Sequence, residues 1–526
     1  MGQDAVRRLA RGQPRLPRRG VRMTALVARI DRLLGRVTMY LLVLGILVVL
    51  AVLAVVLGAV GAIPFDPLTL LASATVLLAA SWIANQVLGL VFRTTPLLAS
   101  GFITAMLLFF VLEPSLEPDG LLVLALAAAI AAASKYLIAW RGRHLVNPAA
   151  IAAVLVGVTG LTLSSWWVAT GPMLPAVALG ALLILWRTRH LGMGLVYLAV
   201  AGGLLFVRYL AFGADAGSAL SFTLVSSPVV FAAGFMVSEP LTLPPRRWQR
   251  MLYAVVVGVL TSAPLAIGPV RNTPELALVI GGVLAFFFAQ RRGVKLELVE
   301  KRQLTPTAWE FRFRPAAPLR FAPGQYLELT LPHRRPDAGG IRRVFSLTQA
   351  AGDDEVTVGV RIREQPSSFK RALRSLEPGA RLRATGVWGD FTLPRDPGAK
   401  LAFVAAGIGV TPFVSQLRTL AAAGRAADAE LLYAVRASAD LAYREELAAT
   451  GCRVAVLSPD DPGELPAHWT WLGAGALDAE LVHRTIPDAA ERTVYLSGAP
   501  TDVARLRRTL RAAGTRRIRT DVFLGY

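Results

Sequence analysis

Long apolar segments fill the first half of the chain, and short alternating segments fill the second. Ten stretches are apolar enough to form helices across a membrane core, which takes about 20 residues each. They cover residues 38–63, 68–92, 96–112, 120–140, 149–169, 172–186, 191–212, 220–238, 251–270 and 275–290. The pattern predicts a polytopic α-helical membrane domain of about ten spans over residues 38–290, in which segments 172–186 and 275–290 are short.

The charges between these segments alternate in kind. Basic residues fall in every second connection, at Arg93, Arg141, Arg143, Arg187, Arg189, Arg246, Arg247, Arg250, Arg291 and Arg292. Acidic residues fall in the others, at Asp66, Glu113, Asp119 and Asp215, and only Arg271 departs from the pattern. Because Lys and Arg accumulate on the cytoplasmic side, we expect both termini in the cytoplasm. The basic segment 1–37 is then a cytoplasmic tail on anionic lipid.

The second half reads as two soluble domains. Short alternating strands near 296–299, 310–313, 326–331 and 356–361, separated by Pro and Gly turns, predict a small antiparallel barrel over residues 294–397. From residue 398 to 526 the pattern becomes apolar strand, glycine turn and helix, repeated. That order is typical of a parallel α/β nucleotide-binding sheet.

Composition narrows the chemistry. The net charge of +21 could indicate a nucleic-acid partner, but many basic residues lie in the first 37 positions and in the connections between apolar segments, so we expect no nucleic acid. The single cysteine, Cys452, excludes an iron–sulfur cluster held by this chain alone, because such clusters take about four cysteine ligands. No metal site is expected, and electrons would have to travel on another group.

Three motifs in the apolar half resemble a known family of membrane proteins. The motifs are Ser100-Gly101-Phe102-Ile103-Thr104, then Asn147-Pro148-Ala149, then Gly234-Phe235-Met236-Val237-Ser238-Glu239-Pro240, with Lys135 between the first two. They are similar to the NqrB/RnfD family, whose members belong to Rnf-type complexes and to the sodium-pumping NADH:quinone reductase. The resemblance implies a multi-pass protein of the bacterial cytoplasmic (inner) membrane that carries electrons on flavin.

Members of this family hold FMN on a threonine in a Ser-Gly-Ala-Thr-Pro motif near the outer face. The nearest counterpart by order here is Val168-Ala169-Thr170-Gly171-Pro172, so Thr170 is either a flavin attachment point or an ordinary helix-end hydroxyl. A second flavin, FMN or riboflavin, is expected in the membrane domain on this ground. Glu239 is either a functional intramembrane acid or an interfacial carboxylate, and Lys135 is expected to extend toward the membrane surface.

In the soluble half, Arg343-Val344-Phe345-Ser346 suits a flavin nucleotide. An arginine fork binds pyrophosphate, an aromatic ring packs on the flavin, and a hydroxyl can reach its reactive nitrogen. Together with Pro323-Gly324-Gln325-Tyr326 and Gln365-Pro366-Ser367-Ser368-Phe369, the motif resembles the ferredoxin–NADP reductase superfamily. The resemblance implies FAD at Arg343, Phe345 and Ser346, with Ser367 and Ser368 at a phosphate-binding helix start.

A nucleotide turn follows in Phe403-Val404-Ala405-Ala406-Gly407-Ile408-Gly409-Val410-Thr411-Pro412. Its glycines let the backbone approach a pyrophosphate, and its proline fits a first helical turn. We therefore assign NADH or NADPH to Gly407, Gly409, Thr411 and Pro412. The superfamily resemblance places Ser497 and Gly498 near the nicotinamide and an aromatic ending, here Phe523 or Tyr526, over the flavin. Arg436 and Ser438 leave the choice between NADH and NADPH open.

These observations predict a membrane-bound flavin oxidoreductase. Electrons from cytoplasmic NAD(P)H would pass through FAD, with Ser346, Ser497, Phe523 and Tyr526 nearest the chemistry, to an outer flavinylated protein or quinone. One alternative is a membrane-tethered reductase whose apolar half is an anchor or carrier. The other is a haem-type ferric reductase or NADPH oxidase, although the apolar half has only His144 and His190, both in connections.

Overall fold

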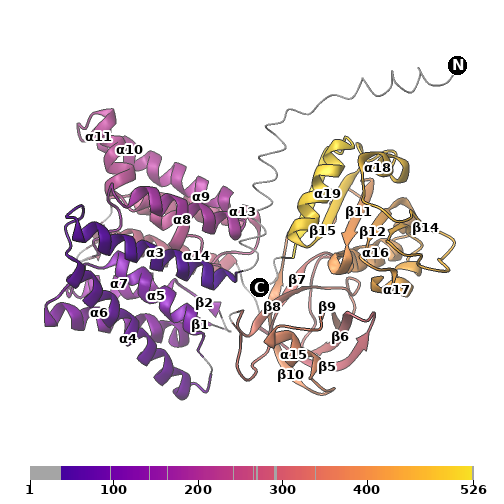
Figure 1. Cartoon of the computed structure of the whole chain (residues 1–526), viewed down its shortest axis with the longest axis horizontal. Helices are drawn as coiled ribbons and strands as arrows, with labels where there is room; N and C mark the ends of the chain where they lie inside the picture. Colours follow the sequence, from indigo (N-terminus) through magenta and orange to yellow (C-terminus); the bar gives the residue numbers. More distant parts are fainter. Residues whose placement is uncertain are drawn as a thin grey trace.

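The computed structural model describes residues 37–94, 96–140, 143–162, 164–240, 242–264, 266–267, 270–288, 293–337 and 339–523. A bundle of helices forms one side of the molecule, and the two β-rich domains form the other (Figure 1). Nearly all of the predicted basic tail, residues 1–36, lies outside the described residues, as does Tyr526.

Each of the ten predicted segments contains helix. In chain order the helices are α3 (Met39–Ala59), α4 (Pro67–Val91), α5 (Leu98–Val111), α6 (Pro118–Leu137), α7 (Pro148–Val158), α8 (Leu174–Arg187), α9 (Leu191–Tyr197), η1 (Leu198–Gly202), α10 (Gly203–Ala211), α11 (Ala216–Ser221), η2 (Phe222–Ser226), α12 (Val229–Phe231), η3 (Ala232–Met236), α13 (Arg247–Ser262) and α14 (Pro274–Phe288). Among the described residues, four helices are long and apolar enough to cross a membrane: α3, α4, α6 and the continuous helix 191–211. A fifth arises if the bent pair α11–η2 and α12–η3 counts as one span. Ten spans of full length are therefore not found in the described part of the chain.

Segment 149–169 illustrates the difference. Helix α7 ends at Val158, and Gly160 takes a positive φ of 72°. The chain then turns back into the bundle, where the backbone N–H of Trp166 donates to Val111 O over 2.9 Å and its indole donates to Glu275 Oε2 over 2.9 Å. The apolar character of this segment thus serves burial against protein. Irregular backbone at membrane depth needs such internal partners.

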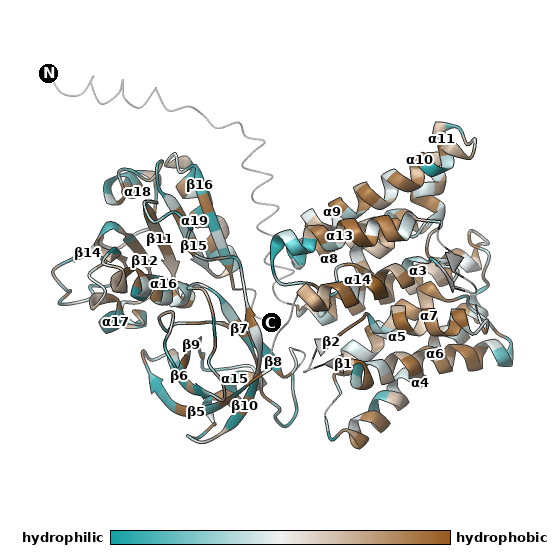
Figure 2. Ribbon diagram, turned by 180° about the vertical axis from the view of Figure 1, so that it is seen from behind, coloured by the Kyte–Doolittle hydropathy of each residue, from teal (hydrophilic) through white to brown (hydrophobic). Residues whose placement is uncertain are grey.

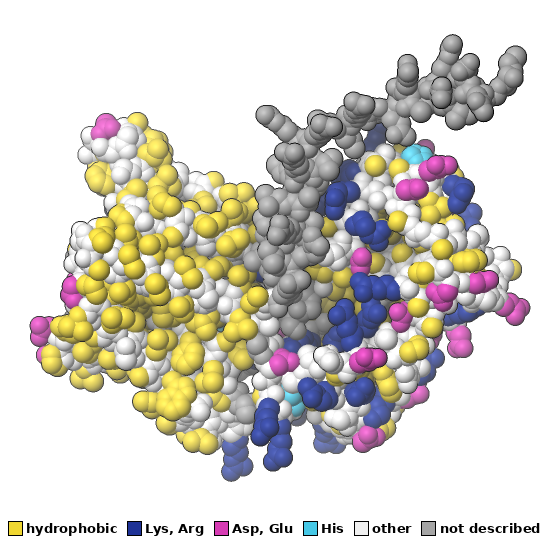
Figure 3. All heavy atoms as spheres, viewed as in Figure 1, with side chains coloured by type: hydrophobic (Ala, Val, Ile, Leu, Met, Phe, Trp, Pro, Cys, Tyr) yellow, Lys and Arg dark blue, Asp and Glu magenta, His cyan; other side chains and the backbone are white. Residues whose placement is uncertain are grey.

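The outside of the bundle is apolar. The ribbon of the bundle is coloured mostly hydrophobic in Figure 2. In the space-filling view, hydrophobic side chains cover the bundle, whereas Lys, Arg, Asp and Glu are spread over the β-rich domains (Figure 3). Leu90 and Val91 near the end of α4 are 81% and 69% exposed. An exterior of this kind is typical of a membrane-embedded surface, so the helical half is suited to membrane association.

The first β-rich domain is a six-stranded antiparallel barrel, as predicted. Its strands are β5 (Gly293–Gln303), β6 (Ala308–Pro315), β7 (Tyr326–Thr330), β8 (Arg342–Ser346), β9 (Val356–Arg361) and β10 (Arg381–Trp388), in the order β8-β7-β10-β5-β6-β9. Short helix α15 (Ser368–Arg374) buries Phe369 and Leu373 against the barrel core. This packing fixes the start of α15 beside β8.

The second is a parallel sheet with the order β14-β13-β12-β11-β15-β16. Its strands are β11 (Leu401–Ala406), β12 (Glu430–Ala434), β13 (Arg453–Leu457), β14 (Trp469–Trp471), β15 (Thr493–Gly498) and β16 (Arg517–Val522), and the flanking helices are α16 (Thr411–Ala422), α17 (Arg444–Ala448), α18 (Ala479–Thr485) and α19 (Pro500–Ala512). The strand order reverses between β11 and β15. In such sheets ligands bind beyond the carboxyl ends of the strands at this reversal.

Two contacts show how the barrel side lies against the bundle. The backbone N–H of Arg247, the first residue of α13, donates to Asp390 Oδ2 over 2.8 Å. Gly340, just before β8, lies close to Leu97, just before α5. A Cβ added at Gly340 would be only 3.7 Å from the Leu97 side chain. The barrel edge that carries Arg343 therefore faces the ends of α5 and α13.

Candidate functional site

Arg343 and the start of α15 meet at one carboxylate. The guanidinium of Arg343 lies 3.2 Å from Asp337 Oδ1, and the backbone N–H of Ser368 donates to Asp337 Oδ2 over 2.8 Å. The same guanidinium donates to the carbonyl of Arg342 over 2.7 Å. The two groups predicted to hold an FAD phosphate thus converge on a single anion. Such a set of donors suits an anionic group, which here is the Asp337 carboxylate.

The surroundings of this anion position are positively charged. Lys370 donates to the carbonyl of Arg361 over 2.7 Å. Burial, assisted by Arg363, Arg343 and Arg361, lowers the pKa of Lys370 to about 8. Ser367 is the N-cap of α15 and accepts the backbone N–H of Lys370 over 3.4 Å. Like charges crowded around a helix start are relieved when an anion binds there.

The remaining members of the Arg-x-Phe-Ser motif point to different faces of β8. Phe345 is 9% exposed and packs into the barrel core, with its ring 6.0 Å from that of Phe369. Ser346 pairs in register with Tyr326 of β7, which pairs with Trp388 of β10. The rings of Tyr326 and Trp388 lie 6.1 Å apart. Tyr326 therefore lies on the strand next to Ser346 and Trp388 lies one strand further on; sequence reasoning missed Trp388.

The predicted nucleotide turn lies at the strand reversal. Gly407 takes a positive φ of 56°. A Cβ at Gly409 would clash with the carbonyl oxygen of Ser497, so only glycine lets the turn approach the end of β15 this closely. Thr411 donates to the carbonyl of Ile408 over 3.0 Å, and Pro412 lies in the first turn of α16. The tertiary structure thereby brings the turn and Ser497-Gly498 together.

A buried hydroxyl and a carboxyl complete this corner. Ser497 is fully buried, and its Oγ has no hydrogen-bond partner within the described part of the chain. Asp521 pairs with Ser497 in register on β16, and burial raises the pKa of Asp521 from 3.8 to about 6. Phe523 follows, and its backbone N–H donates to Gly498 O over 2.9 Å. Sequence reasoning missed Asp521, whose only signal was its place two residues before Phe523.

The three motifs of the helical half surround one space, here called the motif cavity. It has about 670 Å³ of empty volume, which includes space open to the surroundings, and its lining includes Ser100, Thr104, Asn147, Pro148, Gly234, Phe235, Ser238, Glu239 and Pro240. Glu239 Oε2 is buried without a hydrogen-bond partner among the described residues. Tyr40 of α3 also lines the space and lies near Arg343 of the barrel. The motif cavity therefore lies at the end of the bundle that is close to the predicted FAD site.

Lys135 and Asn147 both form hydrogen bonds inside the bundle, and for Lys135 this differs from the expected extension toward the membrane surface. Lys135 does not extend outward; its ammonium donates to the carbonyl of Ser100 over 2.9 Å, because α6 packs beside the start of α5. Asn147 caps α7 by accepting the backbone N–H groups of Ala149 and Ala150 over 3.0 and 3.1 Å. The Asn-Pro-Ala motif thus starts a helix at the cavity wall.

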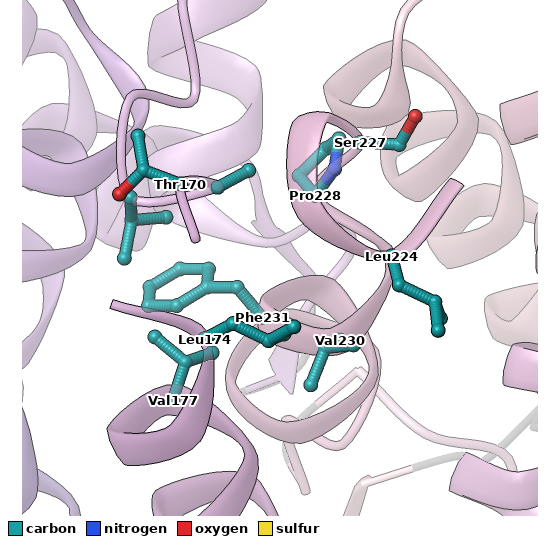
Figure 4. A pocket seen from close by; sticks show the side chains of 10 residues that line it. Thr170, Leu174, Val177, Leu224, Ser227, Pro228, Val230 and Phe231 are labelled. Atoms are coloured by element: carbon teal, nitrogen blue, oxygen red, sulfur yellow. The ribbon is translucent and has the colours of Figure 1, made fainter. Parts of the chain in front are cut away.

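Thr170 lies in a separate, smaller space, here called the Thr170 pocket. It has about 210 Å³ of empty volume, and its lining includes Leu174, Val177, Leu224, Ser227 and Phe231 (Figure 4). The hydroxyl of Thr170 is buried and has no hydrogen-bond partner in the described residues, while its carbonyl accepts the N–H of Met173 over 3.1 Å. The pocket would have to widen to admit a flavin ring, so attachment at Thr170 stays a prediction.

Comparisons with known proteins concern the second half of the chain. Residues 403–505 match the family model described as the oxidoreductase NAD-binding domain. The chain is 38% identical over 165 residues to ferredoxin--NADP reductase B of Sorangium cellulosum, covering 30% of this chain and 65% of that protein. It is 29% identical over 211 residues to an NADPH oxidoreductase of Mycobacterium tuberculosis, covering 39% of this chain and 51% of that protein. The chain thus covers less than two-thirds of either relative.

Solved structures resemble the same region. A ferredoxin NADP+ reductase from Neisseria gonorrhoeae with bound FAD and NADP is similar over 44% of this chain and 99% of that chain. The sequence identity is 19% and the TM-score is 0.37.

Proposed function

We propose that this chain, whose C-terminal half is an FAD- and NAD(P)H-binding oxidoreductase region of the ferredoxin reductase family, passes electrons into and across its helical half. The acceptor on the far side would be a flavinylated protein or a quinone. One observation carries the proposal: the three membrane motifs enclose a single cavity next to the barrel edge that bears Arg343. A simple anchor would not need such a space beside the FAD site.

In the soluble half, one group of residues would bind FAD and another would bind NAD(P)H for hydride transfer. Arg343 and the N–H of Ser368 would hold the FAD pyrophosphate once Asp337 moves aside. The Gly407–Pro412 turn would hold the NAD(P)H pyrophosphate, with Ser497 beside the nicotinamide. FAD, when bound, accepts a hydride and can release single electrons. Asp521 and Phe523 would close the same corner against water.

The motif cavity would take the next redox group. Its apolar walls, such as Ile103, Leu107 and Phe235, and its few polar groups are typical of pockets for planar ring ligands. Ser100, with Lys135 behind it, and Glu239 lie where a ring carbonyl or ring nitrogen could be bound. A second flavin, FMN or riboflavin, suits this chemistry, and a quinone head group is the alternative occupant.

A tethered reductase is the competing function, and the Thr170 pocket favours it. That pocket is too small for a flavin ring as it stands, and four or five candidate spans would suffice for an anchor. In this case the chain would hold FAD alone, and no electrons would leave it through the bundle.

The test begins with a flavin inventory of the purified full-length chain, followed by stopped-flow reduction with NADH and with NADPH. Filling the motif cavity with Thr104→Phe should leave reduction of FAD unchanged but abolish transfer beyond it and displace the second flavin. Thr159→Phe, at an exposed helix end, is the matched control. FAD as the sole flavin, with no electron transfer beyond it in membranes, would establish the tethered reductase instead.

A further inference from the structure

A stacked pair of phenylalanines joins the motif cavity to the Thr170 pocket. Phe235 lines the motif cavity, and Phe231 lines the Thr170 pocket. Their ring centroids lie 4.6 Å apart, and the ring planes are inclined by only 11°. Figure 4 shows the Phe231 ring between Thr170 and Val177. The two spaces are thus separated by little more than one aromatic stack.

The two spaces lie at different depths in the bundle. Helix α8 passes both, with Val177 at the Thr170 pocket and Ile184 at the motif cavity. Seven helical residues correspond to a rise of about 10 Å. The motif cavity lies near the end of α8 that faces the barrel, because Tyr40 lines it and lies near Arg343. The stack therefore runs away from the FAD site, along the direction in which electrons would cross.

The backbone around the stack is specialised. Residues 232–236 form a π-helical turn, with the N–H of Val237 donating to Ala232 O over 2.8 Å. π-Helical turns are rare and occur frequently at functional sites. Glycines also seat the segment closely, since a Cβ at Gly180 would lie 3.0 Å from the Phe235 ring and a Cβ at Gly234 would clash with Ala181 Cβ. Small residues on α8 and η3 thus fix the position of Phe235.

We propose that the Phe231–Phe235 stack is the contact through which electrons leave the motif cavity toward the Thr170 pocket. The inference rests on the proposed function. The rings are neither oxidised nor reduced; each electron would leave a reduced flavin or quinol in the motif cavity, which is thereby oxidised, and would reduce the outer acceptor, a flavinylated protein or a quinone, near the Thr170 pocket. Electron transfer slows steeply as the distance between donor and acceptor that contains no bonded or closely packed atoms increases. Two rings in contact shorten that gap more than branched aliphatic side chains would.

The experiment uses the full chain in sealed liposomes with ferricyanide trapped inside and NADH or NADPH added outside. One hydride then supplies two electrons, which reduce two trapped ferricyanide ions, and one proton stays outside. Phe235→Leu and Phe231→Leu should slow reduction of trapped ferricyanide several-fold, whereas the rate of FAD reduction stays at the wild-type value. Phe235→Trp, which keeps an aromatic ring, should retain most of the rate.

Two further variants guard against misfolding. Phe110→Leu is the matched control, because Phe110 contacts the Phe231 ring at 5.6 Å but is absent from the lining of both spaces. Gly180→Ala would press on Ile46 Cγ2 at 2.7 Å and on the Phe235 ring at 3.0 Å, so it should shift the ring without removing it and also slow the transfer. Wild-type rates of ferricyanide reduction in Phe231→Leu and Phe235→Leu would overturn the role of the stack alone. Failure of the wild-type chain to reduce trapped ferricyanide would overturn the proposed function and the stack with it.

Discussion

Asp337 is the residue that joins the two parts of the predicted FAD phosphate site. Its carboxylate joins Arg343 of β8 to the first N–H of α15, two groups that are far apart along the chain. Both donors were predicted from sequence, but the acid that occupies them was not. A carboxylate held in this way competes with any phosphate for the same donors.

Replacement of Asp337 by Asn should tighten FAD binding. The amide removes a negative charge from the phosphate position, and hydrogen bonds to charged groups are worth about 1.5–3 kcal/mol each, so we expect a gain of about tenfold or more in affinity. Quenching of FAD fluorescence on titration of the apo chain measures this. Asp353→Asn, on an exposed loop, is the control. Weaker binding would mean that Asp337 instead holds Arg343 in place for FAD.

Asp521 should make stability depend on pH. Because burial raises the pKa of Asp521 to about 6, the folded chain binds a proton there that the unfolded chain has already lost. Its contribution to stability is therefore fully present below about pH 4 and is lost as the pH rises through about 6. Asp521→Asn should remove this loss of stability. The temperature at which FAD is released on heating, measured from about pH 4.5 to 7.5, reports the stability. An unchanged profile, equal to that of exposed Asp354→Asn, would contradict the assignment.

At the scale of elements, the nucleotide turn and the end of β15 depend on each other. The sequence indicated a phosphate-binding role for Gly409, but the structure adds a packing role, because the Ser497 carbonyl occupies the space where a side chain would lie. Gly498 has a φ of 155°, and a Cβ there would lie 2.8 Å from Ala406 Cβ. Both strand ends at the reversal are thus shaped by glycine.

Gly409→Ala should therefore damage the NAD(P)H site more than the FAD site. The new methyl group forces β15 away from the turn, and overpacking of this kind costs about 1–3 kcal/mol. We expect a raised KM for NAD(P)H with ferricyanide as acceptor, together with an unchanged content of FAD. Gly398→Ala is the control, since its nearest neighbour would be Asp396 Oδ1 at 3.4 Å. Equal KM values in the two variants would refute the packing role of Gly409.

At the scale of the whole molecule, the question is how the barrel is held on the bundle. Asp390 follows β10 and the ring of Trp388, and its carboxylate accepts the first N–H of α13. A carboxylate at a helix N-terminus is stabilising by about 0.3–1 kcal/mol at the surface. The bond therefore orients the two halves more than it strengthens the fold.

Asp390→Ala should slow electron transfer from FAD into the helical half. The barrel would lose its fixed angle on α13, while hydride transfer from NAD(P)H to FAD, which does not depend on this bond, should keep its rate. Stopped-flow traces in liposomes separate the two steps. Asp396→Ala, whose carboxylate bonds only the nearby N–H of Gly398 at 2.9 Å among the described contacts, is the control. Loss of both steps would indicate damage to the barrel itself.

The sequence by itself determined the local features of this protein. The apolar helical half, the barrel strands and the glycine turn before α16 were all predictable, because each depends on residues that are neighbours along the chain. The resemblance of short motifs to known families also pointed to FAD and NAD(P)H. The two cofactor-binding domains of the C-terminal half were thus predictable from the sequence.

Tertiary structure alone decided the rest. Hydropathy does not distinguish a helix facing lipid from a segment buried in protein, so the turn-back at Trp166 and the smaller number of candidate spans could not be foreseen. The inward direction of Lys135, the place of Asp521 beside Ser497 and the gathering of three motifs around one cavity are contacts between distant segments. Such contacts are fixed by packing and register, which no local pattern of residues records.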